Sequence, residues 1–135
     1  MGESGEGRPA VLVSRCLLGV ACRYHGKTHR MGRRIGRPGL IERLRRSYRL
    51  VDVCPECDAG LPTPRPPTRI VDGRWICNGR DVTAVFRHGA EMALAAARRE
   101  GCGRAYLLRG SPACDRISGM CGQLLEEHGI RVIGV

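Results

Sequence analysis

The chain has 135 residues, of which 42% are hydrophobic and 4% aromatic, and it carries a formal net charge of +10. This length fits one compact domain with a single core. No uninterrupted apolar stretch reaches the roughly 20 residues of a membrane span, and the first residues lack the basic start and apolar run of a signal peptide. We therefore expect a cytoplasmic protein with a flexible segment at residues 1–9 and one domain at residues 10–135.

The positive charge comes almost wholly from arginine, which supplies 22 of the 23 basic side chains. One explanation is a compositional preference for arginine over lysine. The functional explanation is a basic surface that attracts an anionic partner such as a nucleotide or RNA. The densest run extends from Arg30 to Arg49. No nucleic-acid-binding motif accompanies this run, so nucleic acid is a possible partner that no motif supports, and the oligomeric state is not indicated.

The first half of the chain predicts two strands, a helix and a loop. Residues 10–14 are apolar and β-branched, which indicates a buried strand. Residues 38–47 predict a short helix, because a proline suits its start and three apolar residues form a stripe. Residues 49–53 predict a second strand. The proline-rich residues 60–67 predict an extended, stiff loop on the surface.

The second half continues the alternation of strands and helices. Asp72-Gly73 predicts the turn of a hairpin within residues 69–76. A long amphipathic helix is expected from Asp81 to about Glu100. A third strand (105–108), a final helix (123–128) and a last strand (130–133) follow. This order predicts an α/β fold, a three-layer sandwich with a mostly parallel central sheet, in which ligands bind at the carboxyl ends of the strands.

Three of the eight cysteines occupy equivalent places in this map. Cys16, Cys54 and Cys114 each follow a predicted strand. Singly, each is better explained as a small buried residue. If the strands are parallel neighbours about 4.8 Å apart, however, the three thiols converge on one crevice, where soft thiolates could hold a cube-shaped iron–sulfur cluster. With only three ligands, one iron would stay open to bind something else.

Two polar residues and one cysteine pair accompany these positions. Glu56 is a candidate general acid or base if it is buried, and otherwise an exposed loop charge. Ser111 is a candidate polar site residue or a turn former. Cys54-Pro-Glu-Cys57 has no second Cys-x-x-Cys partner, which excludes a local zinc finger. The pair also resembles a thiol redox motif, but no helix is predicted to start on it, as a low-pKa thiol would prefer.

Six separate stretches form an ordered series of motifs. They are residues 14–24 (Ser-Arg-Cys-Leu-Leu-Gly-Val-Ala-Cys-Arg-Tyr), 53–56 (Val-Cys-Pro-Glu), 60–67 (Gly-Leu-Pro-Thr-Pro-Arg-Pro-Pro), 81–83 (Asp-Val-Thr), 89–91 (Gly-Ala-Glu) and 111–114 (Ser-Pro-Ala-Cys). In this order they resemble the motifs of the bacterial thiouracil desulfidase family, an iron–sulfur desulfidase domain that was formerly a domain of unknown function. The likeness extends from about residue 10 to the end of the chain.

The resemblance implies an enzyme whose 4Fe-4S cluster is bound by three cysteines and removes sulfur from a thiolated pyrimidine, giving uracil and sulfide without net redox. It assigns the cluster to Cys16, Cys54 and Cys114, the acid/base role to Glu56, and the assisting role to Ser111. Cys22 lies in a family motif and is an alternative ligand. Arg65, in the proline-rich loop, is a candidate for binding a substrate anion or for anchoring the loop.

The chain departs from the family pattern after Cys114. The segment from Cys114 to Cys121 is shorter than the usual glycine-rich loop, which leaves a related small thiocarbonyl compound as an alternative substrate. Cys121 is a further alternative ligand. As a fourth ligand it would close the open iron and indicate a non-catalytic iron–sulfur or zinc protein, such as a redox sensor or a partner in RNA thiolation. A cluster with an open iron is expected to be oxygen-sensitive.

Overall fold

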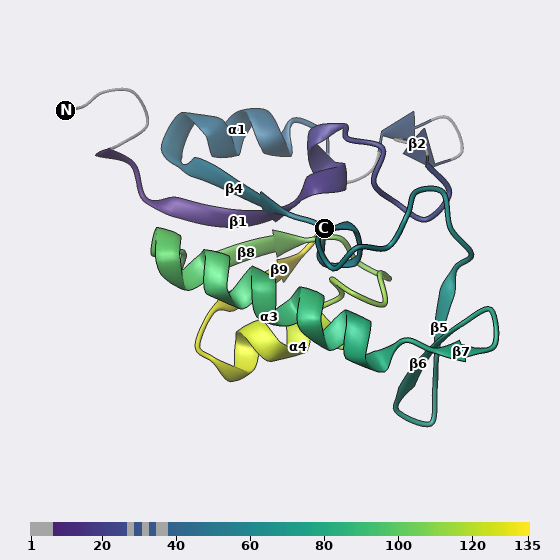
Figure 1. Ribbon diagram of the computed structural model, residues 1–135. Helices are drawn as coiled ribbons and strands as arrows, with labels where there is room; N and C mark the ends of the chain where they lie inside the picture. Colours follow the sequence, from purple (N-terminus) through teal and green to yellow (C-terminus); the bar gives the residue numbers. More distant parts are fainter. Residues whose placement is uncertain (1–6, 27–28, 31–32, 35–37) are drawn as a thin grey trace.

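A parallel four-stranded sheet forms the centre of the computed structural model (Figure 1). The structure describes residues 7–26, 29–30, 33–34 and 38–135. The strands of the sheet are β1 (Ala10–Ser14), β4 (Arg49–Val53), β8 (Arg104–Leu107) and β9 (Arg131–Gly134). They lie in the order β4-β1-β8-β9, and every neighbouring pair is parallel. The predicted parallel sheet is therefore confirmed.

Helices cover both faces of this sheet, as the three-layer prediction requires. Helix α1 (Leu40–Ser47) lies on one face, and α3 (Thr83–Glu100) and α4 (Met120–Glu127) lie on the other (Figure 1). From β1 the chain crosses to β4 on one side and then to β8 on the other, so the strand order reverses between β1 and β8. Such a reversal is where open α/β sheets form their ligand crevices.

Smaller elements surround the carboxyl ends of the strands. The 3-10 helix η2 (Arg15–Leu18) follows β1 directly, and the short helix α2 (Pro55–Asp58) follows β4. The predicted hairpin is present as part of a three-stranded antiparallel sheet. Its strands are β5 (Thr68–Val71), β6 (Arg74–Cys77) and β7 (Arg80–Asp81), and a second small sheet pairs β2 (His29–Arg30) with β3 (Arg33–Arg34).

Three helices begin elsewhere than the sequence predicts, and the first of them, α1, begins at Leu40, two residues after the predicted start. Asp81 belongs to β7, and its carboxylate accepts the Thr83 N–H at 2.9 Å, so α3 begins two residues later than expected. Helix α4 begins at Met120, three residues before the predicted start. Its first turn is buried against the preceding loop, where Cys121 N–H donates to the Ala113 carbonyl at 2.7 Å. That tertiary contact, not local propensity, sets the start of α4.

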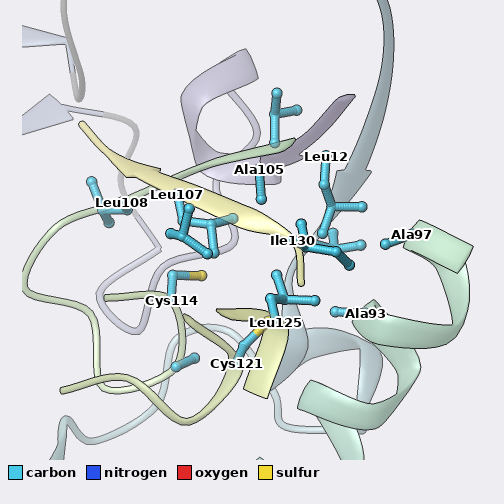
Figure 2. Packing of buried hydrophobic residues seen from close by; sticks show 14 of the residues in the cluster. Leu12, Ala93, Ala97, Ala105, Leu107, Leu108, Cys114, Cys121, Leu125 and Ile130 are labelled. Atoms are coloured by element: carbon cyan, nitrogen blue, oxygen red, sulfur yellow. The ribbon is translucent and has the colours of Figure 1, made fainter. Parts of the chain in front are cut away.

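One apolar core joins the sheet to α3 and α4. Figure 2 shows part of it: Leu12 and Ala105 from the sheet lie near Ala93 and Ala97 of α3 and Leu125 of α4. All of these side chains are almost completely buried. No helix within the described ranges is long and apolar enough to cross a membrane. Residues 1–6 of the predicted flexible segment, and Arg37 of the arginine run, lie outside the described residues.

A glycine in α3 sets how closely α3 approaches α2. Gly89 is buried, and a Cβ built on it would overlap the carbonyl oxygen of Pro55, the first residue of α2. Pro55 follows Cys54 directly. Helix α3 therefore packs against the segment at the end of β4 that contains this cysteine. The Gly-Ala-Glu motif at residues 89–91 therefore has a structural explanation in this contact.

Substitution of Gly89 by alanine should destabilise the fold. The added methyl overpacks the α2–α3 contact, and we expect the free energy of unfolding to fall by about 1–3 kcal/mol although alanine has the higher helix propensity. Gly103→Ala is the matched control, because a Cβ at Gly103 meets nothing within 4 Å. Urea unfolding of the wild type and the two variants measures the change in the free energy of unfolding. Equal stability of the Gly89→Ala variant and the wild type would contradict the close contact.

Candidate functional site

A cavity of about 290 Å³ opens at the carboxyl ends of β1, β4 and β8. In Figure 1 the arrowheads of these strands point to the same side, towards the loops that follow them. The cavity thus lies at the reversal of strand order, where the crevice of such a sheet is expected. Its walls include Ser14, Arg15, Cys16, Cys22, Arg23, Tyr24, Val53, Cys54, Pro55, Glu56, Arg65, Pro67, Thr68, Leu108, Gly110, Ser111, Pro112, Ala113 and Cys114.

The ends of β1 and β8 are tied together by a side chain. Ser14 is 1% exposed, and its hydroxyl accepts the N–H of Leu108 at 2.9 Å. This bond continues the β1–β8 pairing one step beyond the backbone ladder. From the sequence, Ser14 is expected to end a strand and to begin the first motif, but no link between strands is expected of it. A single polar residue at the end of an apolar run was the signal that could have identified it.

The three predicted cysteine ligands all line this cavity. Cys16 lies in η2 after β1, Cys54 is the N-cap residue of α2 after β4, and Cys114 lies in the turn that follows β8. Cys22, the alternative ligand from the first motif, also lines the cavity. The structure therefore brings together four thiols from three loops that are far apart in the sequence.

The thiols influence one another and are shielded from solvent. A hydrogen bond with Cys16 raises the pKa of Cys22 to about 12. A hydrogen bond with Cys22, together with burial, raises the pKa of Cys54 well above its usual value. Burial raises the pKa of Cys114 to about 12, against smaller opposing effects of hydrogen bonds with Ser14 and Ser111. Without a bound metal these thiols hold their protons, which a metal or cluster must displace.

Cys54 also begins a helix, contrary to the sequence expectation. Cys54 is the N-cap of α2, so the expectation that no helix starts on the Cys-x-x-Cys pair is wrong. Even so, the pKa of Cys54 is raised, whereas a reactive redox thiol has a lowered pKa. Cys57 does not line the cavity wall, and its thiol donates to the carbonyl of Cys22 at 3.3 Å.

Cys121, the other alternative ligand, lies close to Cys114 but outside the cavity wall. It is 0% exposed in the first turn of α4, beside Leu125 in the core (Figure 2), and it is not among the residues that line the cavity. Burial raises its pKa well above the ordinary value. Its surroundings are those of a small apolar side chain.

Glu56 and Arg65 form a buried ion pair in the cavity wall. Arg65 Nε donates a hydrogen bond to Glu56 Oε1 at 2.9 Å, Arg65 Nη2 lies 2.9 Å from the same oxygen, and the side chains of Glu56 and Arg65 are 12% and 4% exposed. The second carboxylate oxygen, Oε2, has no hydrogen-bond partner in the described part of the chain. Glu56 is therefore not an exposed loop charge, because Arg65 holds one of its carboxylate oxygens inside the cavity wall.

The hydrogen bonds of Arg65 anchor the proline-rich loop. Its Nη1 donates to the carbonyl of Pro62 and the hydroxyl of Thr63, each at 3.0 Å, and its Nη2 also donates to the carbonyl of Cys22 at 3.1 Å. With Glu56, these acceptors surround all three nitrogens of the guanidinium. Of the two roles that the sequence suggested, the geometry matches the anchoring of the loop.

Ser111 combines its two expected features. Its hydroxyl oxygen accepts the N–H groups of Ala113 at 3.1 Å and Cys114 at 3.0 Å, which is the bonding of a turn former. It also lines the cavity. Because the oxygen accepts both N–H groups, the hydroxyl hydrogen remains available to donate to sulfur or to a bound molecule.

The donor set fits a cluster better than a single ion. Within the described residues, no three His, Cys, Asp or Glu side chains are arranged to hold one metal ion. A cluster of four irons and four sulfides is larger than one ion and takes soft thiolate ligands, which is what three strand ends around one cavity offer.

Comparisons with known proteins extend over almost the whole chain. The model of the 2-thiouracil desulfurase family matches residues 11–134. The chain is 31% identical to the protein YbbK of Bacillus subtilis (strain 168) over 148 residues, which cover 91% of this chain and 93% of that protein. It also resembles the solved structure of the 4Fe-4S-dependent thiouracil desulfidase TudS, with a TM-score of 0.81, 35% identity and coverage of 94% of this chain and 91% of that chain.

The short loop after Cys114 is organised by one carboxylate. Asp115 Oδ1 accepts the N–H of Gly110 at 2.7 Å, and Oδ2 accepts the N–H groups of Ile117 and Ser118 at 3.0 Å. Partial burial by itself raises the pKa of Asp115, but these hydrogen bonds outweigh it and lower the pKa below its ordinary value. Asp115 therefore holds both flanks of the turn that carries Cys114.

Removal of this carboxylate should loosen the turn in a pH-dependent way. We expect Asp115→Ala to lower the free energy of unfolding by roughly 0.5–2 kcal/mol at neutral pH, as for the loss of a helix-cap side chain. Because the folded pKa is lowered, the contribution is complete above the unfolded pKa of about 3.9 and declines as the pH falls through the folded pKa.

The difference between Asp115→Ala and the wild type should therefore narrow when urea unfolding is repeated below about pH 4. Glu127→Ala, an exposed position at the end of α4, serves as the control and should change stability by less than about 0.5 kcal/mol. A difference that is independent of pH would show that the charge on Asp115 does not hold the loop.

Proposed function

Because this chain belongs to the 2-thiouracil desulfurase family, we propose that it removes sulfur from a thiolated pyrimidine base or a related small thiocarbonyl compound. The resemblance predicted from the motifs is thereby confirmed at the level of the family. We propose that Cys16, Cys54 and Cys114 hold a 4Fe-4S cluster at the carboxyl ends of the strands. The observation that carries this proposal is the presence of all three thiols, together with Glu56, in one cavity.

The proposed cofactor and the protein supply different parts of the chemistry. A 4Fe-4S cluster held by Cys16, Cys54 and Cys114 would supply an open iron, which is a soft Lewis acid and would suit a thiocarbonyl sulfur. The protein supplies the cavity that orients the substrate and the groups that move protons. The net reaction is a hydrolysis: the oxygen of water replaces sulfur on the carbon, both hydrogens of water leave with sulfide, and no electrons are gained or lost.

We assign the role of general base to Glu56. Arg65 holds Oε1, which leaves Oε2 to take a proton from a water molecule as that water attacks the carbon. The same carboxyl can then return the proton to the departing sulfide. Ser111 can donate its hydroxyl hydrogen to the ring or to the negative charge that develops during the attack. Both Glu56 and Ser111 line the cavity.

We also propose that residues 10–135 work as one domain. The apolar core includes both Ala10 and Val135, and the walls of the cavity come from segments between Ser14 and Cys114. The separate parts of the site therefore depend on the same core.

Iron content and sulfide release test this function directly. After anaerobic reconstitution we expect four irons and four sulfides per chain, a paramagnetic resonance signal of a cluster with one distinct iron, and sulfide release from 2- or 4-thiouracil. Cys16→Ser, Cys54→Ser and Cys114→Ser should each lose the cluster, whereas Cys102→Ser should keep it, because Cys102 is buried but does not line the cavity. Exposure to air should bleach the wild-type cluster.

Other results would point to the second function. A single zinc, or a cluster that Cys121→Ser destroys, would favour a non-catalytic sensor or partner protein. A fully loaded cluster that releases no sulfide from either thiouracil would leave the cofactor in place and refute the proposed substrate class.

Glu56→Gln separates the mechanism from the cofactor. The amide keeps the size of the side chain but cannot take a proton, so we expect sulfide release to fall by about 10²- to 10⁴-fold while the absorption spectrum of the cluster is unchanged. Glu127→Gln is the control and should match the wild type. Sulfide release at the wild-type rate by Glu56→Gln would show that Glu56 is not the base.

A further inference from the structure

We propose that the ion pair between Arg15 and Asp58 is a positioning element that fixes the loop of Cys16 relative to the loop of Cys54 and thereby determines how firmly the cluster is held. The proposal rests on the proposed function, because it takes Cys16 and Cys54 as ligands. It adds Arg15 and Asp58 to the site, and neither residue was a candidate site residue from the sequence alone. Arg15 directly precedes Cys16, and Asp58 ends the helix that Cys54 begins.

Asp58 holds the backbone of Cys54. Its Oδ2 accepts the N–H of Cys54 at 3.1 Å, so the side chain reaches back over the single turn of α2. The helix N-terminus leaves such N–H groups without a partner in the helix, and Asp58 satisfies this one. The position of Asp58 is thus linked to that of Cys54 by both the helix backbone and a side-chain hydrogen bond.

Arg15 donates hydrogen bonds from two nitrogens to the carboxylate of Asp58. Nη1 donates to Asp58 Oδ1 at 2.9 Å, and Nη2 donates to Asp58 Oδ2 at 3.2 Å. Nε donates to Asp52 Oδ2 at 2.6 Å, on the neighbouring strand β4. A planar guanidinium with two parallel hydrogen bonds to one carboxylate defines an orientation as well as a distance. Three donors thus place Arg15 against both β4 and α2.

The location of this pair explains why it matters for the site. The β1–β4 ladder ends with Ser14 paired to Val53, so backbone pairing stops immediately before Arg15 and Cys54. Beyond that point the two chains turn into η2 and α2. The Arg15–Asp58 contact bridges them at the wall of the cavity, which Arg15 also lines. The pair therefore continues the link between β1 and β4 where the backbone no longer provides it.

The pair is more than a mobile surface contact. The side chains of Arg15 and Asp58 are 24% and 25% exposed. Burial alone would lower the pKa of Arg15, but its hydrogen bonds with Asp58 and then Asp52 raise it above the ordinary value. Residues behind metal ligands commonly change metal affinity by about 10- to 100-fold when they are replaced, because a rigid set of ligands is organised before it binds.

A second ion pair in the same molecule provides the control. Arg49 Nη1 lies 2.8 Å from Glu100 Oε1, with side chains 39% and 31% exposed, and joins the start of β4 to the end of α3. This pair, like Arg15–Asp58, joins an arginine to a carboxylate over a similar distance. It lies at the amino end of the sheet, however, and neither of its residues lines the cavity. A general loss of stability would affect both pairs alike.

The test compares conservative variants of the two pairs. Arg15→Lys keeps the positive charge but cannot form the bidentate contact. Asp58→Asn keeps the size and one acceptor for the Cys54 N–H. Arg49→Lys and Glu100→Gln are the matched controls. For each full-length protein, reconstituted anaerobically, we would measure iron content, the rate at which the cluster absorbance is lost to a chelator, the paramagnetic resonance spectrum, and the thermal midpoint of the cluster-free form.

We expect the cluster to be lost about tenfold faster from Arg15→Lys and Asp58→Asn, with an altered resonance spectrum, and within about twofold of the wild-type rate in the controls. The double variant should lose it no faster than the faster single variant, because both changes break the same contact. The thermal midpoints show whether each variant folds, and if one does not, the other still decides the comparison.

Equal rates of cluster loss in the site variants and the controls would overturn this inference while leaving the proposed function intact. A double variant whose loss rate is the product of the two single effects would also overturn it, because the residues would then act independently. A wild-type protein that takes up no cluster under the same conditions would overturn the proposed function and this inference together.

Discussion

Parallel pairing of β1 with both β4 and β8 is the constraint on which the candidate site depends. Neighbouring parallel strands deliver their following loops to the same edge of a sheet, and β1 lies between the other two. The loops that carry Cys16, Cys54 and Cys114 therefore meet, although nearly a hundred residues separate the first from the last. Any substitution that shifts β1 relative to its neighbours changes the spacing of all three thiols.

The loops at this edge are held by polar contacts that each serve two segments. The guanidinium of Arg65 joins the loop of Cys22, the carboxylate of Glu56 and the proline-rich loop. The hydroxyl of Ser14 joins β1 to the residue after β8. A buried ion pair contributes little net stability once its desolvation is counted, so we attribute the value of Arg65 to geometry: it fixes one oxygen of Glu56 and leaves the other free.

The sequence predicted the sheet and the residues at its edge better than the contacts between them. The strands at 10–14 and 49–53 have apolar patterns that local reasoning detects, and equivalent positions after strands identified the cysteines. Helix α2 escaped detection because it has four residues and is stabilised by Asp58 reaching back to Cys54. Helix α4 was predicted too late because a tertiary contact starts it, and the role of Arg65 depends on Cys22, which is 43 residues away.

The close approach at Gly89 has a consequence for the evolution of this surface. A side chain at that position would overlap the carbonyl group of Pro55, so the residue in the middle of the long helix α3 depends on the position of the one-turn helix α2. A related chain that replaces this glycine must also reshape the turn after β4. Position 89 therefore offers a marker, independent of the cysteines, for homologues that have kept this turn in the same place.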